Sequence, residues 1–242
     1  MNNGHYLKTI ITVGSHANAA LKAFTQSWKF GWISHINIGA NDSLQDALLA
    51  TKDSFVMLIS DADSACLDKA QSFVDAHPDK AYIECLVLDP QPSKHTITPP
   101  LHLPIAKIVN NESLRAILEC YAHVLCGPSL VCLDFCDMHD WLSSGYLFEQ
   151  HTLENLTIEN IGQVLTERLN RIKNEYACNG KIVAGINAVL IGHDAQFNAL
   201  EKLIIALEPQ EDDGRHISMH SNASPNTHGL SITLFIASKS HR

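Results

Sequence analysis

The sequence has 242 residues, of which 45% are hydrophobic and 18% are charged, and its formal net charge is −9. That length fits one large domain or two small ones, with enough apolar material to bury a core. No basic cluster is present, so a nucleic-acid partner is disfavoured, and an anionic membrane surface would repel the chain. No apolar run reaches the ~18–20 residues that a membrane span needs.

The seven cysteines are odd in number, lie mostly in apolar stretches and form no CxxC pair. This pattern indicates reduced, buried thiols and not a disulfide framework. Cys132 and Cys136 are spaced CxxxC, but we favour small packing residues there over a zinc or redox pair. Residues 1–6 are polar and lack the apolar segment of a signal peptide. We therefore expect a cytoplasmic protein.

The first half alternates strand-like and helix-like segments. Nearly continuous apolar strands with helices between them predict a parallel sheet that is covered on both faces. Five prolines in residues 90–104 interrupt the alternation and predict a loop. The expected strands are 6–14, 32–39, 54–60, 81–89 and 105–110, and the expected helices are 17–28, 43–51, 65–77 and 112–126.

The second half differs and predicts a two-layer α+β domain. A strand over 129–135 runs into an acidic turn, and helix-like segments follow it, notably 159–176. The remaining expected elements are a strand over 180–192, a helix over 195–207, and two strands, 216–223 and 229–238, joined by a polar turn.

Three stretches, in the family's order, resemble FtsZ, the tubulin-like division GTPase. The most specific is LVCLDFCDM at 130–138, which is similar to the family's acidic assembly loop, Asn-x-Asp-Phe-x-Asp after an apolar strand end. Its acids fall on Asp134 and Asp137, while Cys132 replaces the Asn. The resemblance implies catalytic acids that act in trans on the GTP of the next subunit. From the residues alone, Asp137 could equally N-cap a helix that starts near Met138.

The other two stretches lie toward the two ends of the chain. The segment 180–207, with the strands after it, resembles the FtsZ C-terminal domain, and Gly192 and Asp194 carry the match. The segment 9–24 resembles the first strand and phosphate loop of FtsZ, in which Gly14 and Asn18 match. Three positions that are glycine in FtsZ hold Ser15, His16 and Ala17.

The largest departure follows the strand over 54–60. FtsZ has a Gly-Gly-Gly-Thr-Gly-Thr-Gly loop there, because backbone N–H groups must approach the phosphates and a Cβ would intrude. This chain has no glycine in its place, and Asp61 and Asp63 would repel a triphosphate by on the order of several kcal/mol unless a metal intervened. The two acids could hold Mg²⁺ or Ca²⁺, but we favour helix caps.

The alignment around residues 90–128 has two solutions. The segment IVNNESL, residues 108–114, matches either the family's strand-end Pro-Asn-Asp loop or, without a gap back from Asp134, the start of its central helix. The second solution places Asn111 where FtsZ contacts the purine. Gly14, Asn18 and Asn111 are therefore the vestigial nucleotide contacts that the resemblance implies.

Fourteen histidines raise the question of a metal site. His216, His220 and His228 could converge on adjacent strands, but no HExxH motif or close cysteine pair supports a metal there. We expect exposed polar residues and no metal.

The fold class expected from these patterns and the resemblance is α/β of the tubulin/FtsZ type. A shortened parallel-sheet domain without the glycine-rich phosphate loop (1–109) leads through a central helix (110–128) to a smaller α+β domain (129–242). The resemblance implies an FtsZ-like protein that acts through self- or hetero-association and caps or modulates filaments. We expect GTP binding to be lost, no cofactor, and little enzymatic activity.

The expected partners are the protein itself or an authentic FtsZ, with no nucleic acid and no direct membrane binding. The sequence ends at Arg242, so we also expect no FtsZ-type anchor-binding tail. The alternative is a divergent FtsZ-type GTPase that binds GTP and Mg²⁺ and hydrolyses GTP on assembly in bacterial cell division. A third reading is a self-associating structural protein unrelated to division.

Overall fold

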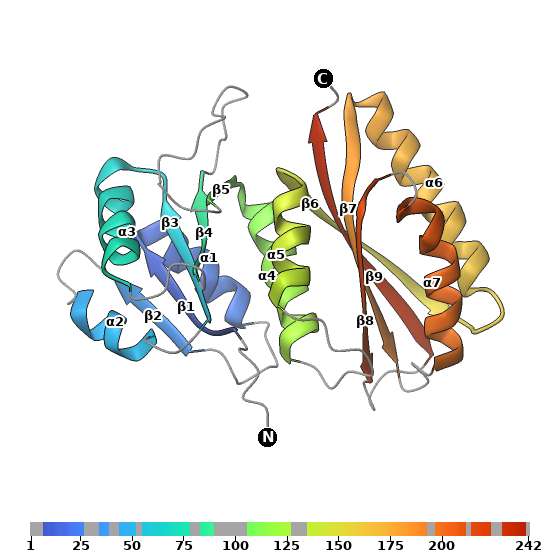
Figure 1. The fold of residues 1–242 in the computed structure, drawn as a ribbon, viewed down its shortest axis with the longest axis horizontal. Helices are drawn as coiled ribbons and strands as arrows, with labels where there is room; N and C mark the ends of the chain where they lie inside the picture. The colour runs from blue at the N-terminus through green and yellow to red at the C-terminus, as the bar shows by residue number, and fades with distance from the viewer. Residues whose placement is uncertain are drawn as a thin grey trace. The chain divides into compact units, whose positions relative to one another are not determined.

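The computed structural model describes residues 7–26, 34–38, 44–51, 55–77, 83–89, 106–126, 135–192, 197–211, 214–223 and 229–240 (Figure 1). The chain divides into unit 1, Met1–Arg115, and unit 2, Ala116–Arg242. The boundary falls inside helix α4 (Asn111–Cys126). The expected division at residues 109 and 128 stays a prediction.

Unit 1 is built on a five-stranded sheet with the strand order β2-β1-β3-β4-β5. Every neighbouring pair is parallel, as the apolar strands between helices predict. The strands are β1 (Leu7–Val13), β2 (Ser34–Ile38), β3 (Phe55–Asp61), β4 (Ile83–Leu88) and β5 (Ala106–Val109).

Helices connect these strands and cover the sheet. They are α1 (Ser15–Gln26), α2 (Leu44–Thr51) and α3 (Ser64–Ala76). Buried side chains of α2 and α3 pack with those of the strands in one apolar cluster, which includes Leu58, Phe73 and Val74. Right-handed connections place α1 on the opposite face, because the chain moves from β1 to β2 in one direction and then back. All strands point the same way, so their carboxyl ends share one edge of the sheet.

Unit 2 contains a four-stranded sheet with the strand order β6-β9-β7-β8. Strand β9 pairs antiparallel with both β6 and β7, whereas β8 is parallel to β7. The two last strands of the chain are therefore not neighbours, since β7 lies between them. The strands are β6 (Leu147–Leu156), β7 (Lys181–Gly192), β8 (His216–Ala223) and β9 (Leu230–Ser240).

Strand β6 lies in a stretch where we expected helix-like segments, and that expectation is wrong for residues 147–156. Its residues, LFEQHTLENL, include Leu, Glu and Gln, which also suit helices. Strand β6 is at an edge of the sheet, so its outer positions stay polar and the apolar alternation is weak. Only Phe148 and Leu156 are buried in it.

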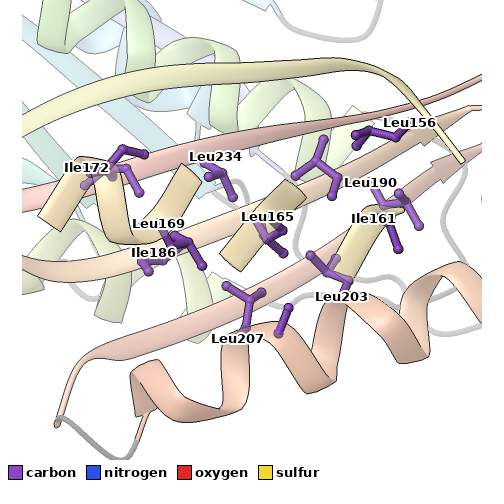
Figure 2. Close-up of a cluster of buried hydrophobic side chains, with 14 of the residues drawn as sticks. Leu156, Ile161, Leu165, Leu169, Ile172, Ile186, Leu190, Leu203, Leu207 and Leu234 are labelled. Carbon is purple, nitrogen blue, oxygen red and sulfur yellow. The ribbon is translucent and has the colours of Figure 1, made fainter. Parts of the chain in front are cut away.

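The apolar core of unit 2 lies between one face of the sheet and two helices, α6 (Ile161–Cys178) and α7 (Phe197–Glu211) (Figure 2). Helix α6 buries residues at intervals of three or four, the stripe expected of a surface helix. In Figure 2 Leu165 and Leu169 of this stripe lie close to the strands, with Leu203 and Leu207 of α7 beside them.

Helix α5 (Phe135–Ser144) packs against the sheet through Trp141. The Trp141 indole N–H donates to the carbonyl oxygen of Phe235 at 3.1 Å, and its ring stacks edge-on against Phe148 with 5.1 Å between centroids. Because α5 begins at Phe135, that residue is helical and not the end of the expected strand; residues 129–134 lie outside the described residues. None of the described helices is long and apolar enough to cross a membrane.

A half-buried polar pair also joins α6 to β6. A guanidinium N–H of Arg168 donates to His151 Nδ1 at 3.0 Å, so the proton of the neutral ring is on Nε2, which lies 3.9 Å from a Glu149 oxygen. Burial, and then the charge of Arg168, lower the pKa of His151, while the carboxylates of Glu149 and Glu175 act in the opposite direction. Neutral His151 is therefore part of the folded arrangement.

We predict that unit 2 loses stability in mild acid partly through His151. The unfolded residue has a pKa of ~6.5 and the folded one a lower pKa, so its stabilising contribution is complete above pH ~6.5 and is lost as the pH falls toward the folded pKa. His151→Asn keeps an oxygen acceptor for Arg168 but does not titrate. Urea unfolding followed by Trp141 fluorescence, in a chain with Trp28→Phe and Trp32→Phe, should show a smaller acid loss in the variant.

The pKa of His123, also in unit 2, is lowered by burial in both proteins, so only the difference between them reports on His151. Equal losses of stability between about pH 7.5 and about pH 5.5 would contradict the assignment.

Candidate functional site

The candidate site lies at the shared carboxyl edge of the unit 1 sheet. Strand β1 leads through Gly14 directly into α1, and β3 ends at Asp61, three residues before α3 begins. Ligands of open α/β sheets bind at this edge, where helix N-termini present unpaired N–H groups. The geometry of these two turns therefore decides which ligand the edge can take.

Gly14 permits the close approach of the two turns. Its φ is +106°, a backbone conformation that L side chains rarely adopt. A Cβ built on Gly14 would also lie 2.8 Å from the Cβ of Asp61 and would overlap its carboxylate. Glycine is therefore required here, and the side chain that needs the space is Asp61.

The carboxylate of Asp61 caps helix α1. Its Oδ1 accepts the backbone N–H of Ala17 at 2.6 Å, and its Oδ2 accepts that of His16 at 3.0 Å. The imidazole Nδ1 of His16 lies 3.3 Å from Oδ2. Asp61 is only 5% exposed. The first N–H groups of a helix have no partner within the helix and carry partial positive charge, so an internal anion occupies the place that a bound anion would take.

Asp63 caps the other helix at this edge. It is the N-cap residue of α3, and its Oδ1 accepts the backbone N–H of Cys66 at 3.0 Å. That backbone hydrogen bond is the largest of the causes that lower the pKa of Asp63. Both acids thus act as the caps we favoured, although Asp61 caps α1, a helix more than forty residues away in sequence.

A cation would fit this edge poorly. Ligand atoms of Asp61, Asp63 and Cys66 lie within 4.8 Å of one another, the one such group of three among the described residues. Burial, followed by the hydrogen bond to Asp63, raises the pKa of Cys66 to about 12, so the metal-free thiol keeps its proton and a cation would have to displace it. The positive ends of α1 and α3 also face this cluster. The edge is an anion-accepting arrangement already satisfied by two carboxylates.

The other two vestigial nucleotide contacts also follow strand ends. The side-chain oxygen of Asn18, in α1, is buried and has no hydrogen-bond partner among the described residues. Asn111 is exposed in the first turn of α4, after β5. Strands β1 and β5 are three strand spacings apart, roughly 14 Å. The nucleotide-contact roles of Gly14, Asn18 and Asn111 stay predictions.

The acids of the FtsZ-like loop belong to unit 2. Asp134 and Cys132 lie outside the described residues. Asp137 is half-buried in the first turn of α5, where an acid favours the helix dipole. Because α5 begins at Phe135, Asp137 is not the N-cap of a helix starting near Met138. The catalytic role in trans that the resemblance implies stays a prediction.

The histidine candidates differ from the expectation of exposed polar residues, because His220 is buried. His216 and His220 lie on β8 and belong to no group of three metal-ligating residues among those described, and His228 is outside them. Of the described cysteines, Cys85 and Cys120 are buried as expected, Cys66 is half-buried, and Cys178 is exposed. The side chain of Cys136 is not described.

The contact of His16 with Asp61 was not predicted from the sequence, in which Ser15, His16 and Ala17 stand only as replacements of glycine. The signal that could have predicted this contact is the pair of carboxylates after β3, Asp61 and Asp63, together with the polar residues after Gly14 at the end of β1. Because β1 and β3 are parallel neighbours, the turns after them lie together.

Comparison with known proteins shows what this arrangement of elements is similar to. No protein-family model matches the sequence, and no curated protein is similar to it in sequence. The solved structures it resembles include an empty FtsZ dimer from M. jannaschii, at 10% identity and a TM-score of 0.58, with 96% of this chain and 88% of that chain covered.

Two CetZ proteins from Haloferax volcanii are similar as well. The CetZ2 protofilament with bound GTPγS has 12% identity and a TM-score of 0.59, covering 97% of this chain and 93% of that one. The GDP-bound CetZ1 monomer has 9% identity and a TM-score of 0.58, covering 97% and 94%. At these identities the likeness concerns the fold, and the chain has the FtsZ/tubulin fold.

We predict that Asp61 and Asp63 respond differently to the same substitution. Asp61 uses two oxygens for two N–H groups, so Asp61→Asn turns an NH₂ group toward one donor and should destabilise unit 1 by about 1–3 kcal/mol. Asp63 uses one oxygen, and asparagine is as good an N-cap as aspartate, so Asp63→Asn should cost less than about 0.5 kcal/mol.

Urea unfolding gives both values, and amide hydrogen exchange at His16 and Ala17 localises the first effect. Equal costs for the two variants, or unchanged exchange at both amides in Asp61→Asn, would contradict the cap described here.

Proposed function

We propose that this protein works through protein association, as a subunit of the FtsZ/tubulin type, and needs no nucleotide to do so. The observation that carries the proposal is the Asp61 carboxylate on the N–H groups of His16 and Ala17. The fold supports it as well, since similar structures include a dimer and a protofilament.

A nucleotide phosphate at this edge would meet unfavourable charge. It would have to displace Asp61 from α1, and it would still lie near Asp63. Two unit charges 4 Å apart repel by roughly 4 kcal/mol at the effective dielectric near a protein surface. The side chains of Ser15, His16 and Ala17 also narrow the approach to the backbone that glycines would leave open. The displacement of Asp61, the repulsion by Asp63 and the steric hindrance by these side chains each weaken the binding of GTP.

The partner we propose is a second copy of the chain or an authentic FtsZ. The acidic residues Asp134 and Asp137 would form the surface that faces the neighbouring subunit. A subunit that keeps this surface, but presents no nucleotide to the next subunit, would cap or modulate a filament. A place in bacterial cell division and in the cytoplasm is part of this proposal.

A divergent GTPase is the alternative, with Asp61 and Asp63 as ligands of a metal that accompanies the nucleotide. The two proposals differ in how association depends on GTP. A GTPase of this type would assemble in response to GTP, whereas a subunit that needs no nucleotide would associate equally with and without it.

We predict that association of the purified protein does not require GTP bound to this chain. Sedimentation measures this association for the protein alone and for its mixture with FtsZ polymers. Alone, the protein should sediment equally without nucleotide, with GDP and with GTP plus Mg²⁺, because no phosphate binds. Added to FtsZ with GTP, it should change polymer mass or turnover. A GTP-dependent increase in self-assembly would favour the GTPase, and the absence of any association would contradict the proposal.

Asp137→Lys tests the acidic surface, and Glu154→Lys, an equal charge change at an exposed position of β6, is its control. Association should fall severalfold in the first variant and stay near the wild-type value in the second, as expected for a charge at the interface and one outside it.

A further inference from the structure

Helix α7 carries an outward face that unit 2 leaves uncovered. Phe197 is 71% exposed, Ile204 is 43% exposed and Ile205 is 55% exposed. Their spacing of seven and eight residues places all three on one side of the helix. Large apolar residues that gather on one exposed helix face mark an interaction surface more often than isolated ones do.

Acidic side chains share this face. Glu201 and Glu208 are exposed and are spaced to lie among the apolar residues. A second α7 face would place carboxylates against carboxylates, so a two-fold contact through α7 is disfavoured. A partner surface complementary to the α7 face therefore carries a positive charge and has small side chains that leave room for Phe197 and Ile204.

The exposed face of α1 has both properties. Ala19, Lys22, Ala23 and Gln26 are exposed at intervals of three, four and seven residues and form one stripe. The two alanines are small, so another helix can approach closely, at about 8 Å between axes. Lys22 supplies the positive charge, and none of the described residues holds it in an ion pair.

We propose that the α7 face of one copy docks on the α1 face of a second copy, with Glu201 against Lys22 and with Phe197 and Ile204 over Ala19 and Ala23. This contact rests on the proposed function and deepens its self-association. Because the contact joins two different faces, it is heterologous: the first copy keeps its α1 face free, and the second keeps its α7 face free for a further copy.

The size of the contact sets its strength. Helix α7 has fifteen residues and is roughly 22 Å long. One helix pair of this length buries less than the ~800 Å² per partner of a typical stable interface. Association should therefore rise gradually with protein concentration and not produce a stable dimer at low concentration.

Charge exchange tests the contact, with sedimentation velocity over a concentration series as the readout. Glu201→Lys and Lys22→Glu should each weaken association by about five- to tenfold, and the double variant should recover to within about threefold of the wild type. Ile204→Ser should weaken association by about tenfold through lost apolar contact. Leu49→Ser, at a 69% exposed position of α2, should leave association unchanged.

All of these positions are exposed, so far-UV circular dichroism should confirm that each variant is folded. If the wild type associates but Glu201→Lys and Ile204→Ser associate equally well, the α7 contact is wrong and the proposed function stands. If the single charge variants fail and the double variant does not recover, the pairing of Glu201 with Lys22 is wrong. If the wild type stays monomeric at every concentration, self-association itself fails, and the contact with it.

Discussion

The structure of unit 1 depends on one carboxylate. Asp61, at the end of β3, supplies the anion that the N-terminus of α1 requires, and so it ties the turn after β1 to the turn after β3. In a nucleotide-binding sheet a phosphate satisfies such N–H groups. Here the chain satisfies them itself, and Gly14 leaves the space for it. These two N–H groups are thereby satisfied without a ligand, and we propose that a nucleotide phosphate finds neither free donors nor room at this edge.

This constraint changes what the family resemblance implies. A fold whose nucleotide edge is closed from within can still present surfaces to other subunits. The surfaces that we propose for association are the apolar and acidic face of α7, the small-residue face of α1, and the acidic surface that includes Asp137 of α5. In the proposed contact the carboxylate of Glu201 meets the ammonium group of Lys22, and this charge complementarity favours one partner surface over others.

Much of the fold follows from periodicity. The apolar runs of β1, β3 and β4 could only be strands buried on both faces, and the helices between them forced a parallel sheet. Strand β6 was not predicted because an edge strand needs few apolar residues, and its Leu, Glu and Gln also suit a helix. The sequence also did not predict which strands pair with β8 and β9. Two strands that follow one another in the chain need not pair, because a third strand, here β7, can lie between them.

The candidate site was predictable only in part. The absence of glycine after β3, and the preference of Asp61 and Asp63 for capping, could be read from the sequence. That Asp61 caps α1 and not α3 is a long-range pairing, which depends on the register of β1 against β3. The residue types at positions 16 and 17 do not reveal this capping by themselves, because the N–H groups involved belong to the backbone, which every residue type except proline supplies.

The most direct test of the account is an amide-resolved NMR titration of the protein with GTP and Mg²⁺, observing His16 and Ala17. If the carboxylate of Asp61 occupies both N–H groups, neither resonance should move at millimolar nucleotide, and Asp61→Asn should shift both in the absence of any ligand. Saturable shifts of these two amides in the wild-type protein at micromolar GTP would contradict the account.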